Sequence, residues 1–123
     1  MTLATFLQPG WFAVLIAWNF AVLSAAQLTI RLIMAFSVRL TLVAAVAVSL
    51  AALPIAGAYD LIVGSPSSVA VRLSWAPLSM VLTGLVGFAV ARWLLRIRRL
   101  RGQIIAGFMM GLLDPHVFTL LSP

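Results

Sequence analysis

The chain has 123 residues, of which 64% are hydrophobic and 8% are charged, and its formal net charge is +6. Its mean hydropathy is +1.20, and it lacks the charged surface of a soluble domain, in which about a quarter of the residues are charged. The absence of cysteine excludes disulfides, thiolate metal sites and cysteine nucleophiles.

Several apolar runs approach or exceed the roughly 18 to 20 residues that cross a hydrocarbon core. Their Ala-, Leu- and Met-rich sequences do not alternate as the strands of a transmembrane barrel would. The sequence therefore predicts an all-α, multi-pass integral membrane protein forming one membrane domain over residues 1–123. We expect three transmembrane helices, short interfacial helices and a C-terminal re-entrant or interfacial segment.

The first span covers about residues 11–30, and we expect it to be retained because no basic n-region of a secretory signal precedes it. It contains three polar side chains, Asn19, Ser24 and Gln27, and the last two share a helix face with Arg31. Lipid cannot satisfy polar groups at membrane depth. This pattern predicts interhelical hydrogen bonds, with a polar pore lining as the alternative.

The second span covers about residues 40–58 and contains a stripe of small side chains. Such a stripe lets helix backbones approach closely. Pro54 is expected to kink or loosen the last turn, because proline removes a backbone donor. The members of the stripe are Ala45, Ser49, Ala52 and Ala56.

A polar connection follows, in which Asp60 and Arg72 cancel in charge. Ser65 and Pro66 resemble a helix N-cap and a first-turn proline, which predicts a short interfacial helix that ends before Trp75. An aspartate in such a loop is more often solvated or paired with arginine than a proton or ion site.

The third span covers about residues 76–95 and begins at Pro77. Its small-residue stripe repeats the spacing of the second span, so we expect the two stripes to face each other as an antiparallel hairpin. The stripe consists of Met80, Gly84, Gly87 and Ala91.

Beyond Ala91 we expect the helix to continue as a basic amphipathic helix over about residues 92–105, lying at the lipid headgroups. Anionic lipid is the expected contact, with an acidic protein surface as the alternative. The arginines assigned to lipid or partner contact are Arg31, Arg39, Arg92, Arg96, Arg98, Arg99 and Arg101.

Residues 104–123 are expected to form an interfacial tail or a re-entrant hairpin. Ten apolar residues, Ile104 to Leu113, are too few to cross alone. A longer crossing would place Asp114 and His116 inside the membrane at high cost. The Gly107–Gly111 GxxxG match is weak evidence for packing in so glycine-rich a chain.

The arginines also predict an orientation. The first connection carries Arg31 and Arg39, the second is neutral, and five arginines follow the third span. By the positive-inside rule, the N-terminus lies outside and the arginine cluster is cytoplasmic. All basic residues are arginine, and lysine and glutamate are absent. This composition is typical of a GC-rich bacterial genome, which indicates the bacterial inner membrane.

The chemistry of the side chains argues against an enzyme. Asp60 and Asp114 are the only acids and His116 is the only histidine, and no nucleophile–base pair, phosphate loop or metal cluster is present. We expect no cofactor bound directly by side-chain ligation, phospholipids as the candidate ligands, and no nucleic-acid partner.

We therefore expect a non-catalytic accessory or structural subunit of a larger bacterial inner-membrane complex, respiratory, photosynthetic or secretory. It would contribute helix packing and lipid anchoring, and its partners would be other integral membrane subunits and anionic lipids. One alternative is a holin-like pore-former. A small channel or carrier lined by Asn19, Ser24 and Gln27 ranks last, because it lacks a titratable group within the spans.

Overall fold

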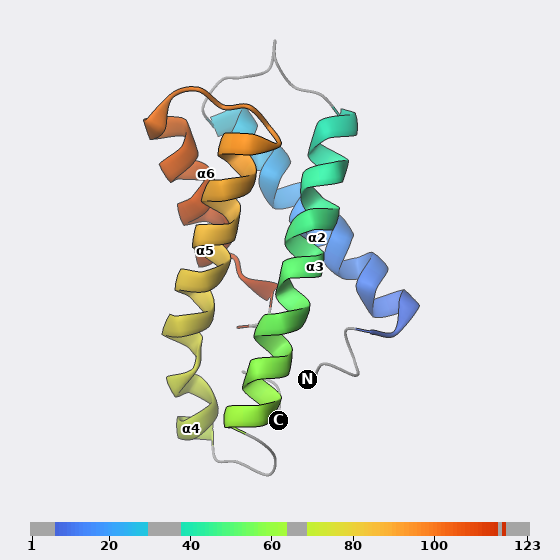
Figure 1. The fold of residues 1–123 in the computed structure, drawn as a ribbon, viewed down its shortest axis with the longest axis vertical. Helices are drawn as coiled ribbons and strands as arrows, with labels where there is room; N and C mark the ends of the chain where they lie inside the picture. The colour runs from blue at the N-terminus through green and yellow to red at the C-terminus, as the bar shows by residue number, and fades with distance from the viewer. Residues whose placement is uncertain (1–6, 30–37, 64–68, 116, 118–123) are drawn as a thin grey trace.

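The computed structural model describes residues 7–29, 38–63, 69–115 and 117. Over these ranges the chain forms helices and no strand, which confirms the predicted all-α class (Figure 1). The helices are α2 (Pro9–Thr29), α3 (Val38–Ile62), α4 (Val69–Ser74), α5 (Ala76–Trp93) and α6 (Leu100–Leu112).

Within this part of the chain, three helical stretches are long and apolar enough to cross a membrane: Pro9–Thr29, Val38–Ile62 and Ala70–Trp93. The last combines α4 and α5. Trp75 lies between them, donates its N–H to the carbonyl of Arg72 in α4 and accepts from the N–H of Ser79 in α5. α3 continues past Pro54, which lies on an exposed position. The predicted cap at Ser65 and Pro66 lies outside the described residues.

After Trp93 the chain reverses direction. The N–H of Leu95 bonds to the carbonyl of Val90 at 3.0 Å, and the N–H of Ile97 bonds to the carbonyl of Ala91 at 2.9 Å. Arg96 adopts a left-handed conformation with φ 56°, which turns the backbone away from the helix axis.

The expected continuous basic helix over residues 92–105 is therefore wrong. Its assumed apolar stripe would have placed Ile97 toward lipid. Instead Ile97 is 5% exposed and packs with Ala26, Ala91 and Ala106. Burying this side chain draws residues 94–99 into a compact turn, from which α6 starts in the opposite direction (Figure 1).

Glycines allow the backbones of α5 and α6 to pack closely. A Cβ atom added to Gly107 would lie 2.9 Å from the carbonyl oxygen of Gly84, and one added to Gly111 would lie 2.7 Å from that of Met80. The expected pairing of the α5 stripe with α3 is wrong, because α6 supplies glycines of its own. Glycine permits a closer backbone approach than the alanines and serine of α3.

Two members of the stripe on α3 contact α2 instead. Ser49 hydrogen-bonds to Asn19, and Ala56 packs against Leu15. A larger core joins α2, α3, α5 and α6. It consists of Val22, Leu23, Ala44, Ala45, Val48, Val90 and Met110.

The helix ends fall into two groups (Figure 1). The start of α3 and the turn between α5 and α6 lie at one end of the bundle, whereas α4 and the end of α3 lie at the other. Arg39 and the five arginines from Arg92 to Arg101 thus gather at one end, while Arg72 on α4 lies at the opposite end.

Candidate functional site

A buried polar pair connects α2 and α3 near the middle of both helices. The side-chain amide of Asn19 donates from Nδ2 to Ser49 Oγ at 2.9 Å. Ser49 in turn donates to the carbonyl of Ala45 at 2.7 Å. Asn19 is 1% exposed and Ser49 is fully buried, so this hydrogen bond lies inside the bundle.

A second polar pair lies nearer the arginine-bearing end. Gln27 Nε2 donates to Thr41 Oγ1 at 2.8 Å, and both residues are buried. Ser24 Oγ is buried without a hydrogen-bond partner, while Arg31 lies outside the described residues. Two of the three polar residues singled out on α2 therefore bind α3, which is the geometry of helix packing rather than of an open polar path.

Asp114 is the main residue that sequence reasoning missed. It was expected at an interface, but it is 2% exposed inside the bundle. Ser79 on α5 donates from Oγ to Asp114 Oδ2 at 2.5 Å. Next to it, Trp18 of α2 donates from Nε1 to the carbonyl of Leu113 at 2.8 Å. The end of α6 is thus fastened to both α5 and α2.

A weak signal for this arrangement exists in the sequence. Ser79 and Thr83 are polar, lie one helical turn apart on α5, and share a face. Both are buried, at 0% and 6% exposure. A polar face within an apolar helix requires a polar partner, and Asp114 is the acid that the fold brings to it.

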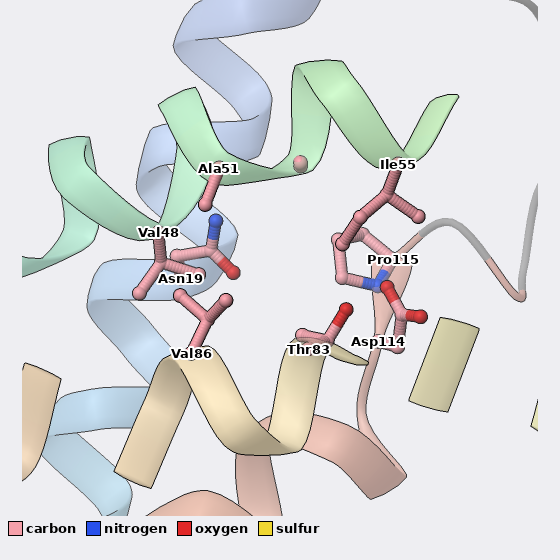
Figure 2. Close-up of a pocket in the computed structure, with 9 residues that line it drawn as sticks. Asn19, Val48, Ala51, Ile55, Thr83, Val86, Asp114 and Pro115 are labelled. Carbon is pink, nitrogen blue, oxygen red and sulfur yellow. The ribbon is translucent and has the colours of Figure 1, made fainter. Parts of the chain in front are cut away.

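A small, partly open cavity of about 10 Å³ lies among these polar groups (Figure 2). Its polar lining comes from Asn19, Thr83 and Asp114, on three different parts of the chain. Asn19 Oδ1 is buried and has no hydrogen-bond partner in the protein. The remaining wall is apolar and consists of Val48, Ala51, Ala52, Ile55, Val86 and Pro115.

A larger hollow of about 420 Å³ lies on the outer side of the α5–α6 hairpin. Its rim is strongly exposed: Phe108 and Leu85 are 67% and 61% exposed. Its lining is apolar apart from backbone. It consists of Met80, Val81, Gly84, Leu85, Phe88, Ile104, Gly107, Phe108, Gly111 and Leu112.

Five of the seven arginines predicted to contact lipid or a partner lie around the α5–α6 turn. All five are exposed, and Arg39 is exposed at the start of α3. The Arg92 guanidinium lies 5.6 Å from the ring centre of Trp93, within the range of a cation–π contact. Gln103 Nε2 donates to the carbonyl of Ile97 at 2.7 Å and fastens the turn that carries the arginines.

Among the described residues, no group of three or more His, Cys, Asp and Glu side chains is placed to hold a metal ion. Asp60 lies near the end of α3, whereas Asp114 lies beyond α6, and His116 is outside the described residues. Comparisons with known protein families, curated proteins and solved structures found no match to this chain.

Proposed function

We propose that this chain crosses the bacterial inner membrane three times, with its N-terminus outside and its arginine cluster in the cytoplasm. The three long apolar stretches support the crossings. The gathering of Arg39 and the five arginines of the α5–α6 turn at one end of the bundle supports the orientation. In this orientation α6 is re-entrant, and Trp93 lies at the interfacial depth that tryptophan favours.

Within that membrane, we propose that the protein is a non-catalytic accessory subunit of a larger complex. The observation that carries this proposal is the apolar hollow on α5 and α6. Membrane helices associate where small residues let backbones come close, and Gly84, Gly107 and Gly111 line the hollow. A transmembrane helix of another subunit is the occupant that fits this surface.

Two further features agree with a packing role. The interior at mid-length is filled by side chains, and the cavity there is only about 10 Å³, too small for a conducting path. The arginines around the α5–α6 turn supply contacts for anionic lipid headgroups, which attract basic segments next to membrane helices. The protein would thus contribute helix packing and lipid anchoring.

Site-specific photocrosslinking tests the docking surface. A photoreactive residue at Leu85, inside the hollow, should crosslink to one defined membrane protein in native membranes. The matched control is Leu50 on α3, which is 52% exposed but outside the hollow, and which should crosslink mainly to lipid. The same partner should co-purify with the chain in mild detergent.

The alternative outcome is equally clear. If Leu85 and Leu50 yield the same products, and the chain runs alone in mild detergent, the hollow is a lipid-facing surface. The accessory-subunit proposal would then be wrong.

A small carrier or channel is the second candidate, and one observation favours it. Asp114 is a titratable group buried within the bundle, whereas the three predicted spans contain no acidic residue and no histidine. Ionisable residues buried in membrane helices commonly mark ion or proton pathways. Reconstituted protein that moves no ions across vesicle membranes would contradict this candidate.

A further inference from the structure

Two rows of side chains line the apolar hollow on α5 and α6, and each row continues into an arginine. On α5, Val81, Leu85 and Phe88 line the hollow. Arg92 follows them at the spacing i, i+4, i+7 and i+11, which places all four residues on one helix face. Arg92 is exposed, and at 1.5 Å per residue it lies about 6 Å beyond Phe88 along the helix axis.

The row on α6 has the same form. Ile104, Phe108 and Leu112 line the hollow and are exposed. Arg101 precedes them on the same helix face and is also exposed. It lies about 4.5 Å before Ile104 along the axis. Each wall of the hollow is therefore continued by one arginine.

The two arginines lie at the same end of the hollow, because α5 and α6 run antiparallel (Figure 1). A Cβ atom on Gly111 would contact the backbone of Met80, and one on Gly107 would contact that of Gly84. Four residues along α5 thus match four residues back along α6. Continuing this register by eight residues brings the arginine of the α5 row level with the start of α6, where the arginine of the α6 row is the second residue.

Neither acidic side chain of the chain lies beside these arginines. The chain has two acids. Asp60 is near the end of α3, at the opposite end of the bundle (Figure 1). Asp114 follows the far end of α6, where Ser79 donates to it. Whatever fills the hollow therefore meets positive charge at the arginine end.

This charge discriminates among the membrane helices that could enter the hollow. In the proposed orientation Arg92 and Arg101 are cytoplasmic, and the cytoplasmic ends of membrane helices carry an excess of lysine and arginine. A helix of that common kind would bring like charge against the two arginines, which is costly at an interface. A second copy of this chain would bring the same arginines and is disfavoured for the same reason.

A carboxylate is the group that turns this repulsion into attraction, because arginine binds carboxylate through two parallel N–H donors. We propose that the transmembrane helix that fills the hollow carries an aspartate or glutamate at its cytoplasmic end, which pairs with Arg92 and Arg101. This inference rests on the proposed function, in which a helix of another subunit fills the hollow. It adds the charge by which that helix is distinguished from others.

Photocrosslinking in native membranes, with the photoreactive residue at Leu85, tests the pairing. The crosslinked protein is identified by mass spectrometry, and its docked helix should carry an acidic side chain within about one turn of its cytoplasmic end. Arg92→Glu combined with Arg101→Glu should lower the yield of this adduct by about tenfold or more, because like charges would then face each other. Replacing the partner's acidic residue by arginine should restore the yield.

Leu100→Glu is the control for added negative charge at this end of the bundle. Leu100 is 61% exposed and adjacent to Arg101, but it does not line the hollow. This variant should keep the adduct yield of the wild type. If the doubly reversed chain does not insert, Arg92→Gln with Arg101→Gln takes its place and should lower the yield in the same direction.

The possible failures are distinguishable. A partner helix without an acidic side chain at that end, or an adduct yield that charge reversal leaves unchanged, would overturn the pairing and leave helix docking intact. A loss that the exchange in the partner does not restore would assign the two arginines to anionic lipid and would also overturn it. If Leu85 yields no protein adduct at all, the accessory-subunit proposal fails and this inference fails with it.

Discussion

Single polar side chains fix how α2 and α3 pack against each other in this bundle. Asn19 and Gln27 on α2 each reach across to one hydroxyl on α3. An apolar face alone would let two helices rotate or slide, whereas two hydrogen bonds at different heights fix their register. Buried polar groups are costly only when a partner is lost.

Removing one partner should therefore destabilise the protein. Ser49→Ala leaves the Asn19 amide without its acceptor, and we expect a loss of about 1–3 kcal/mol in the free energy of unfolding. Thermal unfolding in detergent measures the effect. Ser74→Ala is the control, because Ser74 bonds only locally on an exposed surface. Equal stability of the two variants would contradict a structural role for the Asn19–Ser49 bond.

Arg96 stores backbone strain, since a left-handed conformation costs an L-residue roughly 1–2 kcal/mol. Arg96→Gly should relieve that strain, whereas Arg98→Gly, at an exposed position without positive φ, should only add chain entropy to the unfolded state. We expect Arg96→Gly to be about 1–2 kcal/mol more stable than Arg98→Gly. Equal unfolding midpoints in denaturant titrations would show that Arg96 is not strained.

At the scale of the elements, the α5–α6 hairpin depends on its glycines. A Cβ atom on Gly107 or Gly111 meets backbone oxygen at under 3.0 Å, and backbone cannot rotate out of the way. A Cβ atom on Gly87 meets the Cβ atom of Met110 at 2.6 Å, and the backbone of α6 holds that atom in place. Substitution at any of the three glycines should therefore be costly.

We expect a clear contrast within a series of alanine variants. Gly87→Ala, Gly107→Ala and Gly111→Ala should each lose about 2–3 kcal/mol, in the range of overpacked sites. Gly10→Ala should be close to neutral, because a Cβ atom there meets nothing within 4 Å. The unfolding midpoints of the four variants test this expectation. Equal midpoints would show that close glycine contacts do not stabilise the α5–α6 hairpin.

The sequence predicts the elements better than their pairing. The three long apolar runs are visible from length and hydropathy alone, because a membrane-spanning helix needs about 20 apolar residues. The turn after α5 is not visible, since neither glycine nor proline occurs in residues 94–99. Arg96 provides the left-handed residue, and the arginine spacing resembles an amphipathic helix.

The candidate site, like the fold, was predicted only in part. Asn19 and Gln27 stand out as polar residues in an apolar run, and each is buried against α3. Asp114 follows a 13-residue helix, which is too short to span a bilayer. The sequence therefore places this residue in an interfacial or re-entrant segment. Its burial depends on the reversal at Arg96, which only the tertiary structure reveals.

At the scale of the whole molecule, α2, α3 and α5 form a bundle, and α6 returns into it as the second arm of a hairpin with α5. In the proposed orientation α6 starts at the cytoplasmic arginines and covers about 20 Å at 1.5 Å per residue. This length ends inside a hydrocarbon core of about 30 Å. Asp114 would then lie at membrane depth, and the hollow on α5 and α6 would face neighbouring helices.

The most direct test of this arrangement is labelling of single cysteines in intact cells and inverted vesicles with a membrane-impermeant maleimide. The chain has no cysteine of its own, so each variant reports one position. We expect Arg98→Cys to react only in inverted vesicles, Leu61→Cys to react only in intact cells, and Leu112→Cys to react in neither. Rapid labelling of Leu112→Cys from either side would contradict a returning α6 and, with it, the burial of Asp114 within the membrane.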